Sequence, residues 1–406
     1  MRRATQPDQS VTTPIFSVAD EDEEELLPQR TPPPPPPSHK SFFRNSSENR
    51  SSAFRFLRRI NRFLFFAFPR VLVILVLVVV TVAMLPGGWR VALCASNLLP
   101  PPTLRPGENI TFIGHRGCEF PYPENSLHAL RVGAKEAGFV ELDVALTSDG
   151  TVVLMHDQTL DRTTNGTGTT CTRSTQYVKQ LELQMPTRDP LGRMAQGKFC
   201  SFPSPRGTTT PCTYRVPTLE QIFDDLPHHT RFMIDVKECY ADGLPDTVPK
   251  CSNCSLLMQT TRDLMEKYAI SPERVIFTSK LPASLRVFQD GIPRSKYAIS
   301  MDQGYSHYKR SSFRELMTKG AYDYAAMHYG LAAVRPDFVQ IMRTERTKGV
   351  GQMGDVFAWT IRKDLDYRLA RCAGISKMIV AEPHRVKNRF TLNVAEWFGE
   401  SLVTAS

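Results

Sequence analysis

The pattern of apolar and polar positions changes near residue 110. Residues 1–62 are poor in apolar side chains and contain an acidic run and the proline run Pro32 to Pro37. This composition cannot bury enough surface to fold, so we expect a disordered tail with a stiff polyproline II segment. From Ile110 onward, short apolar runs alternate with amphipathic ones, which is typical of a folded α/β domain.

The alternation predicts strands at 110–114, 140–146, 152–155, 232–236, 275–278, 297–301, 324–327, 356–360 and 377–381. Helices are expected between most of them, at 126–136, 219–226, 255–268, 283–290, 313–319, 336–347 and 365–372. Repeated strand–helix units indicate parallel strands, and eight such units close into a (β/α)8 TIM barrel. A doubly wound open sheet is the alternative, but no Gly-rich nucleotide-binding loop opens any helix.

Two segments depart from this repeat. The strand at 152–155 follows 140–146 across a Ser-Asp-Gly turn, so we interpret it as a small β excursion that returns beside its neighbour. Residues 169–217 have little periodicity and contain three cysteines. We expect them to form an ordered, disulfide-tied excursion on the top of the barrel.

An apolar run at 71–85, extended by the aromatic-rich residues 63–69, predicts one transmembrane helix over 63–85. Eight basic residues and one acid lie between Lys40 and Arg70, directly before the apolar run. Membrane lipid is therefore an expected partner. The positive-inside rule places the N-terminus in the cytosol and the C-terminal domain, residues 109–406, in the lumen or outside the cell. Residues 86–108 read as a Pro-rich stalk. A buried core element and a secretory signal cleaved near residue 94 are the alternatives.

The net charge of +9 over 406 residues does not predict nucleic-acid binding. Much of the positive charge belongs to the cluster before the apolar run, and no nucleic-acid-binding motif accompanies it.

The cysteines agree with a lumenal or extracellular domain. Eight of the nine lie between residues 118 and 372, which allows up to four disulfides in an oxidising compartment. Glycosylation sequons at Asn109, Asn165 and Asn253 fit the same location. The Cys251-x-x-Cys254 pair leaves a zinc site open as an alternative, although no second such pair accompanies it.

Charged residues cluster where the predicted strands end. His115 and Arg116 follow the first strand, and His156 with Asp157 ends the return strand. Two further strands carry charged pairs at i, i+2 spacing, which points both members to one face: Glu141 with Asp143, and Asp235 with Lys237. Because the chemistry of TIM barrels lies at the carboxyl ends of the strands, we expect one shared site.

These residue types suit phosphodiester cleavage. Glu141, Asp143 and Asp235 offer hard oxygen ligands for Mg²⁺ or Ca²⁺. Such a cation can offset the charge that develops on phosphorus. Arg116 and Lys237 supply positive charge for phosphate oxygens. Two histidines can divide the acid and base roles. Each group alone is commonly structural, and only their conjunction indicates a site.

The same motifs resemble the glycerophosphodiester phosphodiesterase family. The resemblance covers roughly 111–383 and rests on HRG at 115–117, PEN at 123–125, ELDV at 141–144, TSDG at 147–150, HD at 156–157, LDRTTNGTG at 160–168 and VPTLEQ at 216–221. It implies a TIM barrel, a divalent cation, and hydrolysis of glycerophosphodiesters to glycerol 3-phosphate and an alcohol.

The resemblance also implies a role for each residue. The catalytic pair would be His115 and His156, the metal ligands Glu141 and Asp143, and the phosphate contacts Arg116 and Lys237. Glu124 would orient the site, and Trp359 would border the glycerol of the substrate. Where the family often has glutamate, this chain has Asp235, whose shorter side chain bears on metal distance and metal choice.

Several alternatives stay open. Either water or the neighbouring glycerol hydroxyl of the substrate could attack phosphorus, and the second route passes through a cyclic phosphate. The substrate could instead be a lysophospholipid or sphingolipid, cleaved in the manner of a phospholipase D. A degenerate barrel used for binding is the non-enzymatic alternative, which the intact set of site residues disfavours.

Overall fold

The computed structural model describes residues 71–74, 87–188, 194–196, 201–203, 209–211, 214–237, 239, 253–345 and 354–386. The chain divides into two compact units, Met1–Val73 and Ile74–Ser406, and the second contains the barrel.

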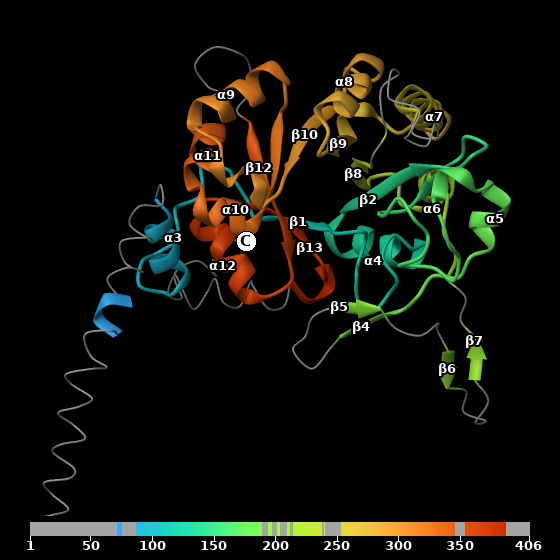
Figure 1. Cartoon of the computed structure of the whole chain (residues 1–406), viewed down its shortest axis with the longest axis horizontal. Coiled ribbons are helices and arrows are strands. Elements are labelled where there is room, and N and C mark those ends of the chain that lie inside the picture. Colours follow the sequence, from blue (N-terminus) through green and yellow to red (C-terminus); the bar gives the residue numbers. More distant parts are fainter. Residues whose placement is uncertain are drawn as a thin grey trace, which may run out of the picture. The chain divides into compact units, whose positions relative to one another are not determined.

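Parallel strands close into an eight-stranded barrel (Figure 1). Its strands are β1 Thr111–Gly114, β2 Phe139–Leu146, β8 Arg231–Val236, β9 Val275–Ser279, β10 Lys296–Met301, β11 Tyr324–His328, β12 Asp355–Ile361 and β13 Lys377–Val380. They neighbour one another in chain order. The last strand, β13, pairs with β1, and β1 meets β2 where Gly114 lies beside Val140. The predicted (β/α)8 barrel is confirmed, and the open-sheet alternative is wrong.

The period-two pattern of the strands separates the inside of the barrel from its outside. One buried apolar cluster takes a residue from each barrel strand: Ile113, Phe139, Met233, Ile276, Ala298, Ala326, Phe357 and Ile379. The alternate residues, such as Val140 and Leu142 of β2, belong to a second cluster shared with the surrounding helices. Residues at i+2 and i+4 from an interior position therefore also point inward.

Helices follow most strands, as the amphipathic pattern predicts. They are α4 Leu127–Ala137, α6 Leu219–Asp225, α7 Cys254–Lys267, α8 Pro282–Gly291, α9 Arg310–Lys319, α10 Tyr329–Val334, α11 Pro336–Gln340 and α12 Asp364–Cys372. Local signals set their ends: Ser126 caps α4 through its side chain, and Thr218 and Gln221 form a capping box on α6. The helix predicted at 336–347 is instead α11 followed by a short π-helical turn, Ile341–Glu345.

The predicted return strand is confirmed as β3 Val152–Leu154, antiparallel to β2. In the excursion that follows, the structure describes a 3-10 turn at Thr170–Thr172, α5 Thr175–Gln180, and the strand pairs β4 Pro186–Arg188 with β5 Met194–Gln196 and β6 Ser201–Pro203 with β7 Thr209–Pro211. A separate apolar cluster packs part of it against β3. Cys171 is disulfide-bonded, whereas Cys200 and Cys212 lie outside the described residues.

The segment predicted as a Pro-rich stalk, 86–108, contains a helix that belongs to the barrel domain. Helix α3, Gly88–Ala95, packs on α12 and buries Val91 and Cys94. A disulfide joins Cys94 to Cys372. The expectation of a separate stalk is therefore wrong, and Cys94 belongs with the cysteines of the barrel domain. The sequence did not show this, because α12, the partner that buries α3, lies far along the chain.

The remaining described cysteines also refine the sequence interpretation. Cys239 is disulfide-bonded to Cys254, so the zinc alternative for Cys251 and Cys254 loses one of its ligands. Cys118 is buried and free. The eight cysteines counted in the domain therefore cannot all pair with one another.

Of the predicted transmembrane segment 63–85, the structure describes only residues 71–74, which are helical with exposed apolar side chains. Among the described residues, no helix combines the length and the apolar character that crossing a membrane requires. The rest of that segment and the tail 1–62 lie outside the described residues.

Candidate active site

Three carboxylates meet inside the barrel on β2 and β8. Phe139 and Met233 belong to the interior apolar cluster, so Glu141, Asp143 and Asp235 on the same strands point the same way. The ladder places Asp143 directly beside Asp235. As a result, one oxygen from each of the three carboxylates lies within 4.8 Å of the others.

The two predicted phosphate contacts lie against these carboxylates. The Lys237 Nζ is 2.9 Å from Asp143 Oδ1 and also pairs with Asp235. The Arg116 Nε is 3.2 Å from Asp143 Oδ2, and its backbone N–H donates to Glu141 Oε2 at 2.8 Å. The structure thus brings both cations to the predicted site.

The cluster carries more negative charge than these cations balance. Burial, together with the charges of Asp143 and Asp235, raises the pKa of Glu141 well above its ordinary value. Burial also acts to raise the pKa of Asp143, but Lys237 and Arg116 hold it below its ordinary value. A hard divalent cation would bind the three converging oxygens and would stabilise the ionised form of Glu141 next to its charged neighbours. The donor set therefore fits Mg²⁺ or Ca²⁺.

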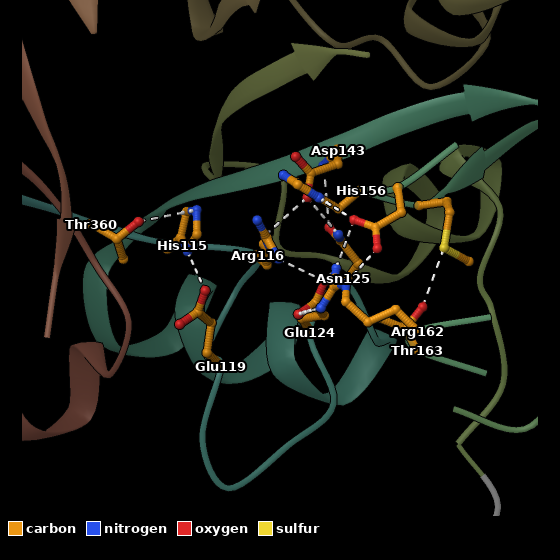
Figure 2. Close-up of polar contacts among 12 residues, drawn as sticks. His115, Arg116, Glu119, Glu124, Asn125, Asp143, His156, Arg162, Thr163 and Thr360 are labelled. Atoms are coloured by element: carbon orange, nitrogen blue, oxygen red, sulfur yellow. Dashed lines mark hydrogen bonds and ion pairs between the residues drawn. The ribbon is translucent and has the colours of Figure 1, made fainter. Parts of the chain in front are cut away.

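His115 lies directly after β1 and is buried against the cluster (Figure 2). Its Nδ1 hydrogen-bonds Glu119, and its Nε2 lies 3.8 Å from Glu141 and 3.5 Å from the Thr360 hydroxyl. Glu119 in turn accepts hydrogen bonds from the Arg362 guanidinium at 2.8 to 3.2 Å. We call His115, Glu119 and Arg362 the His115 group.

Electrostatics favour a neutral His115. Burial is the largest cause and lowers the pKa of His115 below its ordinary value, an effect that the Glu119 charge opposes. The pKa of Glu119 is itself lowered: burial acts to raise it, but the hydrogen bond with His115 and the charge of Arg362 prevail. An ionised Glu119 accepts a hydrogen bond from the Nδ1–H group, so the proton of the neutral ring stays on Nδ1 and Nε2 is the acceptor nitrogen.

His156 follows β3 on the other side of Asp143, whose carbonyl accepts from the Met155 N–H. Its Nδ1 contacts the Asp157 carboxylate at 2.6 Å, and Arg162 pairs with the same carboxylate. The pKa of Asp157 is lowered, since the His156 and Arg162 hydrogen bonds outweigh the effect of burial. We call His156, Asp157 and Arg162 the His156 group.

The loop after β1 connects the two groups. Arg116 donates to Glu124 at 2.6 Å, and Arg162 donates to both oxygens of the same carboxylate at 2.9 and 2.6 Å. The Asn125 amide bonds Asp143 twice, donating to Oδ2 at 2.7 Å and accepting from its backbone N–H at 3.1 Å. Glu124 thus contacts both Arg116 and Arg162, and Asn125 fixes the position of Asp143 (Figure 2).

Trp359 of β12 is half-buried, and its indole N–H donates to the Ala326 carbonyl at 2.9 Å. Its ring packs edge-on against His328. The indole nitrogen is therefore used by the barrel itself, and only the ring face could border a substrate. The neighbouring Thr360, rather than Trp359, contacts His115.

Sequence reasoning missed Glu119, Arg362 and Thr360 as members of the site, gave Arg162 no role, and considered Asn125 only as a candidate helix cap. Arg162 stands in the LDRTTNGTG motif and Asn125 in PEN, so both carried a local signal. Glu119 and Arg362 stand in no motif, and they meet only because β12 ends beside the loop after β1.

The match to a family model is long. Residues 115–385 match the glycerophosphoryl diester phosphodiesterase family. The chain belongs to this family. Mouse glycerophosphodiester phosphodiesterase 1 is 33% identical over 201 residues, which is 47% of this chain and 55% of the mouse protein. A glycerophosphodiester phosphodiesterase of Bacillus subtilis is 28% identical over 190 residues, 47% of this chain and 56% of that protein.

These alignments span about half the length of the curated relatives. Among solved structures, a phosphodiesterase from Oleispira antarctica, in complex with the product sn-glycerol-3-phosphate, superposes with a TM-score of 0.51 at 18% identity. The superposition covers 73% of this chain and 99% of the other. That likeness supports the barrel fold.

Proposed function

We propose that this chain hydrolyses glycerophosphodiesters to glycerol 3-phosphate and an alcohol. The observation that carries the proposal is the placement of two histidines beside one cluster of three carboxylates, two of which are buried. In both histidines, Nδ1 is hydrogen-bonded to a carboxylate. Family membership and the names of the relatives support the same reaction.

A divalent cation, Mg²⁺ or Ca²⁺, would be held by Glu141, Asp143 and Asp235. When bound, it would supply positive charge to the phosphoryl oxygens. The charged groups of Arg116 and Lys237 already contact two of these carboxylates, so they are placed to contact the phosphate as well.

The two histidines would divide the proton transfers. In each, the carboxylate at Nδ1 orients the ring and leaves Nε2 to exchange a proton. One takes the proton of the attacking oxygen, and the other donates to the departing alkoxide. Hydrolysis in ¹⁸O-labelled water, with a search for a cyclic phosphate product, distinguishes direct attack by water from attack by the glycerol hydroxyl.

Product analysis tests the reaction. The full chain, freed of metal with EDTA and then supplied with single metals, is incubated with glycerophosphocholine. The expected products are glycerol 3-phosphate and choline, formed only when Mg²⁺ or Ca²⁺ is restored. Release of phosphocholine, or undiminished activity in EDTA, would contradict the proposal.

Phospholipase D-like cleavage of lysophospholipids or sphingolipids is a second candidate. The exposed apolar side chains of α3, which follows the predicted transmembrane segment, favour it. Rates on glycerophosphocholine and on lysophosphatidylcholine in vesicles separate the two, because a lipid enzyme would turn over only the second substrate well.

We also propose that the chain is a single-pass membrane protein with its barrel in the lumen or outside the cell. The disulfides Cys94–Cys372 and Cys239–Cys254 support an oxidising compartment. The sequon asparagines Asn109, Asn165 and Asn253 are exposed. Glycosidase treatment and thiol labelling of the expressed chain test this: an unchanged mass together with reduced cysteines would refute it.

A further inference from the structure

We infer that Glu119 and Arg362 are positioning residues for His115. The inference rests on the proposed role of His115 in catalysis. It states that Arg362 fixes the Glu119 carboxylate, and that this carboxylate fixes the ring orientation and the protonated nitrogen of His115.

The contacts form one continuous chain. Arg362 donates three hydrogen bonds to the two oxygens of Glu119, a paired geometry that is both directional and strong. Glu119 is 5% exposed and contacts His115 Nδ1. Unlike Glu141, it lies apart from the three converging carboxylates, so its charge serves the histidine and the arginine.

The backbone that carries Arg362 is itself held in place. Both the Arg362 and Lys363 N–H groups donate to one Asp366 oxygen at 3.0 Å, in the first turn of α12. The side chain therefore reaches Glu119 from the fixed start of a helix. A rigid support of this kind can keep a catalytic ring within its productive orientation.

The test compares Arg362→Met with a matched control, Arg131→Met. Both arginines are about half exposed and contact both oxygens of one carboxylate, but Arg131 pairs with Asp225 away from the site. We expect Arg362→Met to lower kcat on glycerophosphocholine about 10- to 100-fold with little change in KM, and Arg131→Met to change neither. Arg362→Lys should restore part of kcat.

A double-mutant cycle sharpens the result. Glu119→Gln keeps an acceptor for Nδ1 but removes the charge, and its combination with Arg362→Met should cost no more kcat than the larger single effect. Additive losses, or an Arg362→Met variant with normal kcat, would overturn the inference. Activity that survives His115→Ala would instead refute the proposed function, so the two failures are distinguishable.

A second inference concerns the outward face of α3. Its inward residues Val91 and Cys94 are buried against α12, whereas Trp89 and Leu93 on the opposite side are exposed. The chain then turns at Asn97, whose φ of 62° is left-handed, and the Leu98 N–H donates to the Leu93 carbonyl at 2.8 Å. Such a helix end brings these two leucines together, yet Leu98 remains 69% exposed.

We propose that this face lies in the interfacial layer of a lipid bilayer. The inference rests on the proposed transmembrane segment, which ends at Leu85. Three residues separate Leu85 from Trp89, so the two Cα atoms are four steps apart, a reach of about 14 Å at most. Tryptophan is favoured at membrane interfaces, and the adjacent Arg90 is placed to meet lipid phosphates.

Tryptophan quenching tests the placement. The full chain is inserted in phosphatidylcholine vesicles, with or without brominated acyl chains, and alkaline extraction confirms insertion. We expect bromine to quench a part of the emission that disappears in Trp89→Phe and persists in Trp359→Phe. Equal quenching in the parent and in Trp89→Phe would overturn the inference. A chain that is dimeric in the vesicles and whose Trp89 emission is not quenched would also overturn it, because the α3 face would then be covered by a second copy. Loss of the chain on alkaline extraction would refute the anchor itself.

Discussion

The His115 group and the His156 group use the same arrangement in two different environments. In each, the histidine Nδ1 contacts a carboxylate and an arginine pairs with that carboxylate. The His115 side chain is 11% exposed, while that of His156 is 35% exposed. The members of the His156 group lie within seven residues of sequence, whereas Arg362 follows β12, 243 residues after Glu119.

The difference shows how a barrel can build one part of a site locally and another from distant strands. The local group stands on a solvent-accessible loop, whereas His115 and Glu119 of the distant group are buried and only Arg362 is partly exposed. A buried histidine depends more on its partners, because no water replaces a lost hydrogen bond. The proposed site thus has one enclosed and one accessible proton-transfer group.

The largest expected effect comes from removing either histidine. We expect His115→Ala and His156→Ala each to lower kcat on glycerophosphocholine by about 10²- to 10⁴-fold, the contribution of general acid or base catalysis. Circular dichroism checks that the fold persists. Full activity in either variant would show that the two groups do not share the catalytic work.

The next largest effect is a loss of stability when a carboxylate between the two groups is replaced. Asp143 is 1% exposed and contacts Lys237 and Arg116, whereas Asp235 is 15% exposed. Asp143→Asn should therefore cost about 3–5 kcal/mol of unfolding free energy in EDTA, as expected when one partner of a buried pair is removed, and Asp235→Asn clearly less. Urea unfolding measures both, and equal losses would contradict this ranking.

A smaller effect is expected at the accessible group. Arg162→Met removes contacts to Asp157 and to Glu124, so we expect kcat/KM to fall about tenfold. The Arg131→Met variant serves again as control. A fall as large as that of His156→Ala would mean that Arg162 itself contacts the substrate.

The smallest effect is a pH dependence of stability. The pKa of His115 is lowered from its ordinary value of 6.5, so below that pH the unfolded chain binds a proton that the folded chain does not. His115 alone should therefore make stability in EDTA fall as pH drops from 6.5 toward the lowered value, by at most about 1.4 kcal/mol per pH unit. The raised pKa of Glu141 acts in the opposite direction, so the difference between the parent chain and His115→Asn measures the His115 contribution. The carboxylate of Asp157, with a lowered pKa, loses its contribution only below its ordinary value of 3.8.

Thermal melts between pH 5 and 8 measure this slope. His115→Asn should remove the His115 part of the slope, because asparagine does not titrate, while the lowered pKa values of His128 and His328 leave a part of it. An unchanged slope in that variant would place the pH sensitivity elsewhere in the chain.

The sequence predicted the barrel strands closely. The second strand, expected at 140–146, is Phe139–Leu146, and the last, expected at 377–381, is Lys377–Val380. Period-two alternation is a property of each strand alone, so it can be recognised in the sequence without knowledge of the fold. Helix α3 was missed because the surface that buries it comes from α12, at the far end of the chain.

By itself, the sequence determined the strand periodicity, the inward direction of Glu141, Asp143 and Asp235, and the two histidines at strand ends. All of these follow from local backbone geometry and from motif residues close together in the chain. The tertiary structure alone decided that Arg362 supports Glu119 and that Cys94 pairs with Cys372. Those contacts join residues more than 240 positions apart, and only closure of the barrel brings them within bonding distance.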